Sequence, residues 1–167
     1  LTEALNTYSW DDESGYYAYV LHDENYEPVK KFTTPEGENL NKGLDGIYPI
    51  IAGACDENQK EKIIGHLTND KEMHSPFGIS AVDMTAGYYM VNGYWNGNIW
   101  FPHQWFIWKS MLDCGERAIA KDIAHMALNI WKREVDDTYY TFEMVNTVTG
   151  CGGWFHNFGG LSTPINM

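Results

Sequence analysis

The stretch FPHQWFIWKSMLDCGERAIAKDIAHMALNIWKREV, residues 101–135, predicts two helices joined by a tight turn. In its second half the apolar side chains recur at helical spacing and form one stripe, made of Ile119, Ile123, Met126, Ala127 and Ile130. Pro102 suits the first turn of a helix and Gly115 suits its end, so the first helix is expected over residues 101–114. Two helices this close in sequence pack as a helical hairpin, which indicates a mainly α fold.

The rest of the chain predicts more helices separated by long loops. Further helical segments are expected at residues 2–10, 44–53, 57–69 and 162–167. Asp56 can cap the helix at 57–69, and residues 15–32 predict a small β-hairpin. Residues 71–98 and 136–160 are expected to be long aromatic loops, and loops of this length are usually functional.

Composition excludes several classes of partner. The chain has 167 residues, with 11 Lys and Arg against 23 Asp and Glu, and its formal net charge is -12. A chain this acidic lacks the basic surface that nucleic acids and anionic membranes require, so neither is expected as a partner. Three scattered cysteines predict buried free thiols, and the six histidines lack metal-ligand spacing, so neither a metal nor a cofactor is expected.

The segment YWNGNIW, residues 94–100, places aromatic rings beside amides on a backbone that suits neither helix nor strand. A sugar stacks its C–H face on an aromatic ring while its hydroxyl groups pair with amides, so these residues are candidates for a sugar site. The sequence equally allows these rings to pack onto the core. Phe101, Trp105 and Trp108 lie at helical spacing, and we expect them to be core.

Glu143 is the candidate catalytic carboxylate. It lies between Phe142 and Met144 in TFEMVNTVTG, whereas the acids at residues 11–13 and 136–137 are expected to be solvated. An acid among apolar neighbours can be held in a defined orientation, which general acid–base chemistry requires. A purely structural role for Glu143 remains the alternative.

Several segments together resemble glycoside hydrolase family 63 and its bacterial relatives. YWNGNIW is similar to the YWRGPIW-type signature of that family, and FEMVNTVTG to its W-E-Q-Y-D-P-E-T-G segment. GLDGIYPIIAG, DKEMHSPFGIS and WFHNFGGLSTPI match other family segments in the same order along the chain. The resemblance implies a six-hairpin α/α toroid, of which residues 1–167 would be a single unit at the C-terminal end of the catalytic domain.

The family resemblance also implies roles for individual residues. Glu143 would be the catalytic base of an inverting α-glucosidase-like hydrolase. The sugar pocket would be lined by six residues, namely Tyr94, Trp95, Asn96, Gly97, Trp100 and Trp154. Asn96 stands where the signature has Arg and Asn98 where it has Pro, so the hydrogen-bond donors facing the sugar are expected to differ.

The family's general acid, an Asp in an S-G-x-D-x-S/Y-P motif, has no counterpart in these residues. The first residue is Leu1 rather than Met, and we expect the chain to be a fragment that needs the upstream part of the toroid. By itself it is expected to be inactive. The alternatives are a non-catalytic carbohydrate-binding or interaction piece and a toroid phosphorylase, in which phosphate rather than water attacks the sugar.

Overall fold

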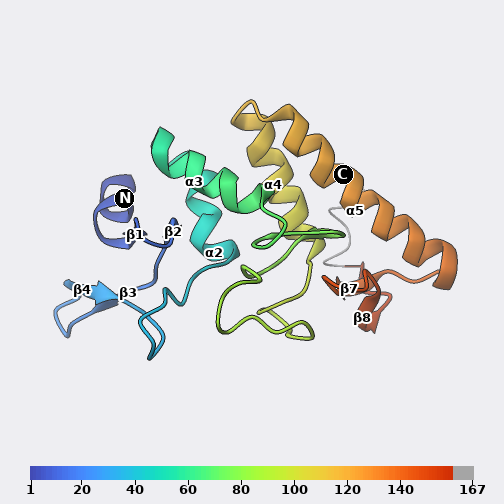
Figure 1. Cartoon of the computed structure of the whole chain (residues 1–167), viewed down its shortest axis with the longest axis horizontal. Coiled ribbons are helices and arrows are strands. Elements are labelled where there is room, and N and C mark those ends of the chain that lie inside the picture. The colour runs from blue at the N-terminus through green and yellow to red at the C-terminus, as the bar shows by residue number, and fades with distance from the viewer. Residues whose placement is uncertain (160–167) are drawn as a thin grey trace. The chain divides into compact units, whose positions relative to one another are not determined.

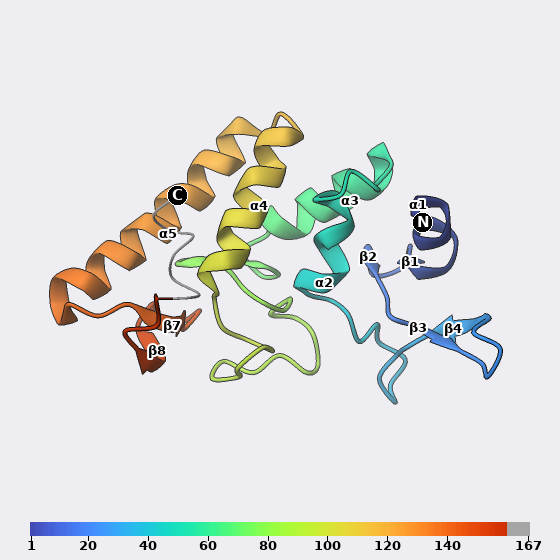
Figure 2. The ribbon, with the colours of Figure 1, turned by 180° about the vertical axis from the view of Figure 1, so that it is seen from behind.

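The computed structural model describes residues 1–159, which belong to two compact units, residues 1–66 and the residues from 67 onward. Figure 1 and, from behind, Figure 2 show the elements of both units. The helix expected at residues 162–167 lies outside the described residues. No helix in residues 1–159 is long and apolar enough to cross a membrane.

The first unit combines short helices with two antiparallel strand pairs. Its elements are α1 (Thr2–Ala4), a π-helical turn (Leu5–Ser9), β1 (Trp10–Asp11), β2 (Tyr16–Tyr17), β3 (Val20–His22), β4 (Pro28–Lys31), α2 (Leu44–Ile47), a 3₁₀ turn (Tyr48–Ile50) and α3 (Glu57–Thr68), whose last two residues belong to the second unit. The pairing of β3 with β4 confirms the predicted hairpin. Asp56 caps α3 as predicted, because its Oδ1 accepts a hydrogen bond of 2.8 Å from the backbone N–H of Gln59. The helix expected over 44–53 keeps only one α-helical turn before Pro49 tightens it.

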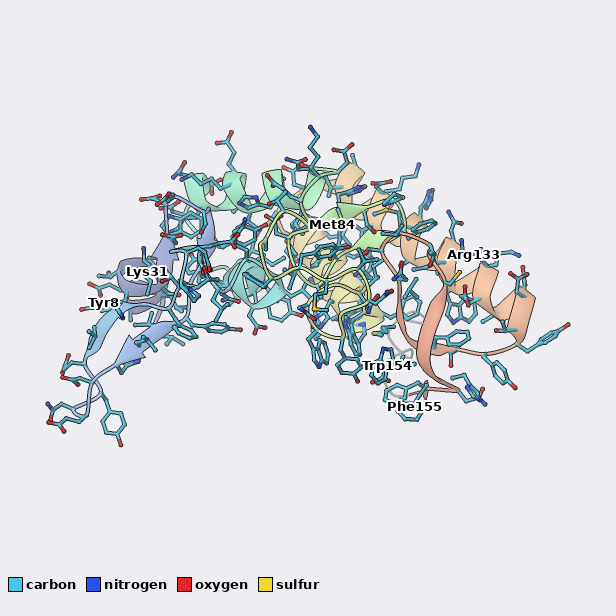
Figure 3. The ribbon with its side chains drawn as sticks, turned by 60° about the horizontal axis from the view of Figure 1, so that its bottom comes forward. Tyr8, Lys31, Met84, Arg133, Trp154 and Phe155 are labelled. Atoms are coloured by element: carbon cyan, nitrogen blue, oxygen red, sulfur yellow. The ribbon has the colours of Figure 1, made fainter. Side chains whose placement is uncertain are left out.

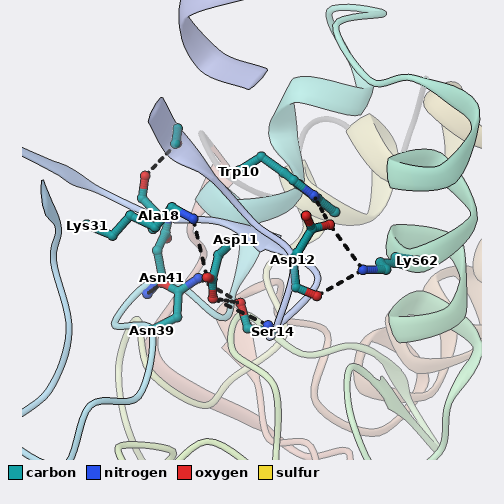
Figure 4. A network of polar contacts seen from close by, with 10 residues as sticks. Trp10, Asp11, Asp12, Ser14, Ala18, Lys31, Asn39, Asn41 and Lys62 are labelled. Carbon is teal, nitrogen blue, oxygen red and sulfur yellow. Dashed lines mark hydrogen bonds and ion pairs between the residues drawn. The ribbon is translucent and has the colours of Figure 1, made fainter. Parts of the chain in front are cut away.

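A chain of polar contacts holds the β1–β2 turn of the first unit against the following loop (Figure 4). Asp11 accepts a hydrogen bond from the Ser14 hydroxyl at 2.5 Å, and Ser14 in turn accepts one from the Asn39 amide at 2.9 Å. Asn39 accepts from the backbone N–H of Asn41, whose side chain donates to the Tyr17 carbonyl at 2.8 Å. Asn39 and Asn41 are buried, so these bonds satisfy amides that would otherwise be costly to remove from water.

The second unit contains the longest helices. Its elements are β5 (His74–Ser75), β6 (Gly78–Ile79), α4 (Phe101–Asp113), α5 (Arg117–Thr138), β7 (Phe142–Val145) and β8 (Gly152–His156). Helices α4 and α5 run antiparallel, joined by a turn in which Gly115 takes a φ of +85° (Figure 2). The predicted helical hairpin is therefore present, and buried Ile123, Ala127 and Ile130 confirm the inner face of α5.

The core of this unit joins the helices to the strand that carries Glu143. Ile99, Phe101, Ile130 and Val145 form one buried cluster, with Phe77 and Trp131 packed against it. Because Val145 belongs to β7 and Ile130 to α5, the strand is fixed on the helical hairpin by apolar packing. Burial of such side chains stabilises the unit by about 2 kcal/mol for each of them.

The apolar face of α4 differs from the predicted one. Phe101 is buried, but Trp105 and Trp108 are only partly covered, and the buried face instead includes Gln104 and Ile107. Gln104 turns inward because its amide pairs with both backbone groups of Ile79 on β6, at 2.8 and 2.9 Å. This polar contact attaches α4 to β6 through the face that carries Gln104, not through the stripe of aromatic residues.

Strand content exceeds the single hairpin that the sequence predicts. Three further antiparallel pairs are present, β1–β2, β5–β6 and β7–β8. Two of them have strands of only two residues, which are too short to show the alternation that identifies a strand in a sequence. None of the three cysteines, which all lie in the described residues, forms a disulfide, and they are partly or fully exposed rather than buried as predicted.

Candidate functional site

Glu143 lies on β7, opposite an irregularity in its partner strand β8. Phe142 pairs with His156 and Met144 with Gly153, so Trp154 and Phe155 both face the single residue Glu143. This is a β-bulge, and bulges commonly redirect side chains next to active sites. Trp154 occupies the bulge with a φ of +62°, a left-handed conformation that is uncommon for a large residue.

The carboxylate of Glu143 is almost completely enclosed, with an exposed fraction of 4%. Its Oε1 accepts a hydrogen bond from the Tyr94 hydroxyl. Its Oε2 has no hydrogen-bond partner among the described residues. A buried oxygen without a partner is costly unless something else occupies the place beside it, such as a water molecule or a substrate hydroxyl. The arrangement therefore leaves one oxygen of a fixed carboxylate available to accept a proton.

Tyr94 is the centre of an aromatic cluster beside this carboxylate. Its ring meets Trp95, Trp100 and Trp154 edge to face, with centroid separations of 5.6, 4.9 and 5.0 Å. Trp95 in turn stacks on Trp100 at 3.8 Å with the two planes 9° apart. Trp95 and Trp154 expose 52% and 63% of their surface, so both rings are accessible from solvent. Figure 3 shows Trp154 next to the exposed Phe155.

Trp100 does not lie on the surface of this site, contrary to the prediction. It is 0% exposed, stacks under Trp95, and donates its indole N–H to the Tyr94 carbonyl at 3.2 Å. Along residues 94–101, the buried aromatic side chains therefore begin at Trp100, and not at Phe101 as predicted. Trp100 supports the exposed ring above it and cannot itself stack on a sugar in this conformation.

Asn96 and Asn98 hold the loop together. The Asn96 amide donates to the Tyr88 carbonyl at 3.0 Å, and the Asn98 amide donates to the Gly93 carbonyl. Each amide therefore makes one hydrogen bond within the loop. The expectation that the hydrogen-bond donors facing a sugar differ from those of the family stays a prediction.

Gly97 allows the two sides of the same loop to approach closely. A Cβ atom at this position would lie 1.8 Å from the carbonyl oxygen of Met90, so any side chain would push the loop apart. Met90 also accepts a hydrogen bond from the Gly93 N–H at 2.8 Å. The role of Gly97 here is to shape the loop that presents Tyr94 and Trp95.

A hollow of about 480 Å³ lies on the other side of β7 from the carboxylate. Met144 lines it and Glu143 does not, because consecutive side chains on a strand point to opposite faces. Its remaining lining consists of Val91, Asn92, Asn98, Asn146, Val148, Thr149, Cys151, Gly152, Gly153 and Trp154. Trp154 is thus shared between the hollow and the Tyr94 cluster. Sequence reasoning missed Asn92 and Asn146, although the turn-forming pattern NTVTG pointed to Asn146.

The contact with Glu143 predicts an abnormal titration of Tyr94. The hydrogen bond to the Glu143 carboxylate raises the pKa of Tyr94, and burial and the nearby negative charge raise it further. Glu143→Gln removes the charge, so we expect the pKa of Tyr94 to fall toward its ordinary value. Tyrosinate absorbance during alkaline titration measures this shift, with Tyr94→Phe as the subtracted background. An unchanged Tyr94 pKa in Glu143→Gln would show that the two groups do not interact.

Comparison with known families decides what this site belongs to. Residues 1–159 match the mannosylglycerate hydrolase MGH1-like glycoside hydrolase domain. The chain belongs to this family. The match confirms the resemblance to glycoside hydrolase family 63 that the sequence motifs indicated. No curated protein matches the chain.

Solved structures similar to this MGH1-like chain agree on the fold. An uncharacterized conserved protein from Thermus thermophilus has a TM-score of 0.74 at 23% identity, over 98% of this chain and 36% of that one. The GH63 mannosylglycerate hydrolase from the same organism, in complex with glucose, has a TM-score of 0.72 at 22% identity, over 98% of this chain and 35% of that one. Neutral trehalase Nth1 from Saccharomyces cerevisiae has a TM-score of 0.69 at 19% identity, over 99% of this chain and 28% of that one. The chain spans about a third of the length of these proteins.

Proposed function

We propose that this chain is part of a glycoside hydrolase in which Glu143 is the general base. The observation that carries the proposal is the enclosed carboxylate with one oxygen on Tyr94 and the other without a partner among the described residues. Such a group keeps a fixed orientation while one oxygen stays available to a water molecule. Membership of a glycoside hydrolase family supports the same chemistry.

The proposed reaction inverts the configuration of the sugar. Glu143 takes a proton from water as the water oxygen bonds to the anomeric carbon and the glycosidic C–O bond breaks. A second carboxylic acid protonates the leaving oxygen, and in inverting enzymes it lies about 6.5–9.5 Å from the base. We assign that acid to a part of the toroid outside residues 1–167, and we place both units of this chain in the same toroid domain.

The sugar would bind against the exposed rings near the base. Trp95 and Trp154 both touch Tyr94, so a sugar stacked on either ring lies close to Glu143. Stacking on indole uses the apolar C–H face of a pyranose, which fits the lack of charged side chains in this cluster of residues 94, 95, 100 and 154. Because similar structures include a mannosylglycerate hydrolase and a trehalase, we propose an α-linked glucoside or a related sugar as substrate.

The stereochemistry of the product tests this proposal directly. The intact protein is incubated with α-linked glucosides and with mannosylglycerate, and proton NMR identifies the anomer released before mutarotation. We expect the β-anomer from an α-linked substrate. Release of the α-anomer would contradict a base role for Glu143.

The two alternative functions give different results in the same experiment. A sugar phosphate that forms only when inorganic phosphate is present would identify a phosphorylase. Quenching of tryptophan fluorescence by the sugar without any turnover would identify a non-catalytic binding protein. Both results would reject hydrolysis as the function.

A further inference from the structure

The loop that carries Tyr94 is tied to the strand that carries Glu143 on both sides of Tyr94. Before Tyr94, the Tyr89 hydroxyl lies 2.7 Å from the Thr147 hydroxyl. After it, Ile99 and Val145 exchange two backbone hydrogen bonds of 2.8 and 2.9 Å. The loop is therefore anchored to the end of β7 on both sides of Tyr94.

Asn146 makes a third contact between the loop that carries Tyr94 and the turn that follows β7. It uses both the nitrogen and the oxygen of its side-chain amide. The Nδ2 group donates to the Val91 carbonyl at 2.9 Å and lies 3.2 Å from Asn92 Oδ1. The Oδ1 atom accepts from the backbone N–H groups of Val148 and Thr149 at 2.9 and 3.0 Å. One side chain thus fixes the turn that follows β7 and the loop that precedes Tyr94.

The backbone of Asn146 is itself held in place by two hydrogen bonds. Its N–H donates to the Cys151 carbonyl at 3.0 Å, and its own carbonyl accepts from the Gly150 N–H at 2.9 Å. The amide is therefore presented from a closed turn, three residues after Glu143. A side chain held in this way costs little additional conformational entropy when it binds the loop.

We propose that Asn146 is the positioning residue that holds Tyr94 against Glu143. It acts as a clamp, defined as the contacts from its Nδ2 to Val91 and from its Oδ1 to the turn. Its effect on catalysis rests on the proposed function of Glu143, whereas its effect on the loop does not. The clamp matters because displacement of a reacting group by about 1 Å can cost about 10²-fold in rate.

Asn146→Asp separates the two halves of the clamp. An ionised carboxylate still accepts from the N–H groups of Val148 and Thr149, so the turn is expected to remain. It has no proton to donate to Val91, and its charge opposes the Val91 carbonyl. We expect backbone amides of residues 90–98 to exchange with deuterium about tenfold faster in the intact protein, and the pKa of Tyr94 to fall toward its ordinary value. We also expect kcat/KM to fall about tenfold.

Asn129→Asp is the matched control, because it adds the same charge on the exposed surface of α5. It should leave amide exchange, the Tyr94 titration and kcat/KM unchanged. Tyr89→Phe, which removes the contact with Thr147, should change all three in the same direction as Asn146→Asp but by less.

The outcomes separate the clamp from the proposed function. Unchanged amide exchange and an unchanged Tyr94 pKa in Asn146→Asp would overturn the clamp, whatever the activity. Faster exchange with a full kcat/KM would also overturn the positioning role, because the loop would then move without consequence. If the wild-type protein hydrolyses no glycoside but the Tyr94 pKa still moves, the clamp stands and the proposed function fails.

Discussion

Glu143→Gln is expected to lower turnover of the intact enzyme by about 10³-fold, the scale of a lost general base. Glutamine keeps a carbonyl oxygen that accepts the Tyr94 hydroxyl, so the cluster of rings should stay in place. It cannot take a proton from water, and attack on the anomeric carbon loses its base. Steady-state hydrolysis of an α-glucoside measures kcat, and circular dichroism reports the fold.

The matched control for this variant is Asp137→Asn, which removes one carboxylate charge from the exposed face of α5. It should retain full turnover. Near-wild-type activity in Glu143→Gln would remove Glu143 from the mechanism. A variant that is inactive and unfolded would instead show that the carboxylate is structural.

The second large effect is expected at Trp100, whose replacement by Ala should lower the free energy of unfolding by about 3–5 kcal/mol. Its indole is completely buried under Trp95, so the truncation leaves a large cavity and removes the hydrogen bond to Tyr94. Urea unfolding followed by circular dichroism measures the loss.

Trp95→Ala provides the paired comparison, since the two rings stack but only one is buried. It should cost about 1 kcal/mol of stability, the scale of one aromatic pair. It should nevertheless weaken glucoside binding, measured by titration of the remaining tryptophan fluorescence. Greater destabilisation by Trp95→Ala than by Trp100→Ala would contradict the assignment of the buried and exposed rings.

The sequence predicted the helical elements well where packing follows a regular spacing. The stripe on α5 was predicted because Ile123, Ala127 and Ile130 repeat at helical spacing and face one core. The aromatic stripe on α4 was predicted wrongly, because the buried face contains the polar side chain of Gln104, which forms two hydrogen bonds with β6. The spacing of apolar residues predicts which face of a helix is buried, but it does not predict a specific pair of hydrogen bonds made by a polar side chain.

The candidate site was predicted only in part. The apolar neighbours of Glu143 indicated an enclosed carboxylate, and the structure gives it an exposed fraction of 4%. Its contact with Tyr94 spans 49 positions, and no short-range sequence pattern specifies a contact at that separation. The same holds for Trp100, because an irregular loop has no repeat that separates inward from outward residues.

At Trp154 the backbone conformation favours glycine for stability, whereas the proposed contact with a sugar favours an indole ring. A non-glycine residue in this conformation costs about 1–2 kcal/mol, part of which glycine would recover. Glycine would also remove the indole ring that packs edge to face against Tyr94. Laboratory evolution that rewards heat resistance alone would therefore favour loss of this indole, whereas selection on substrate use would retain it. Its persistence in variant libraries would show which of the two pressures the protein was under.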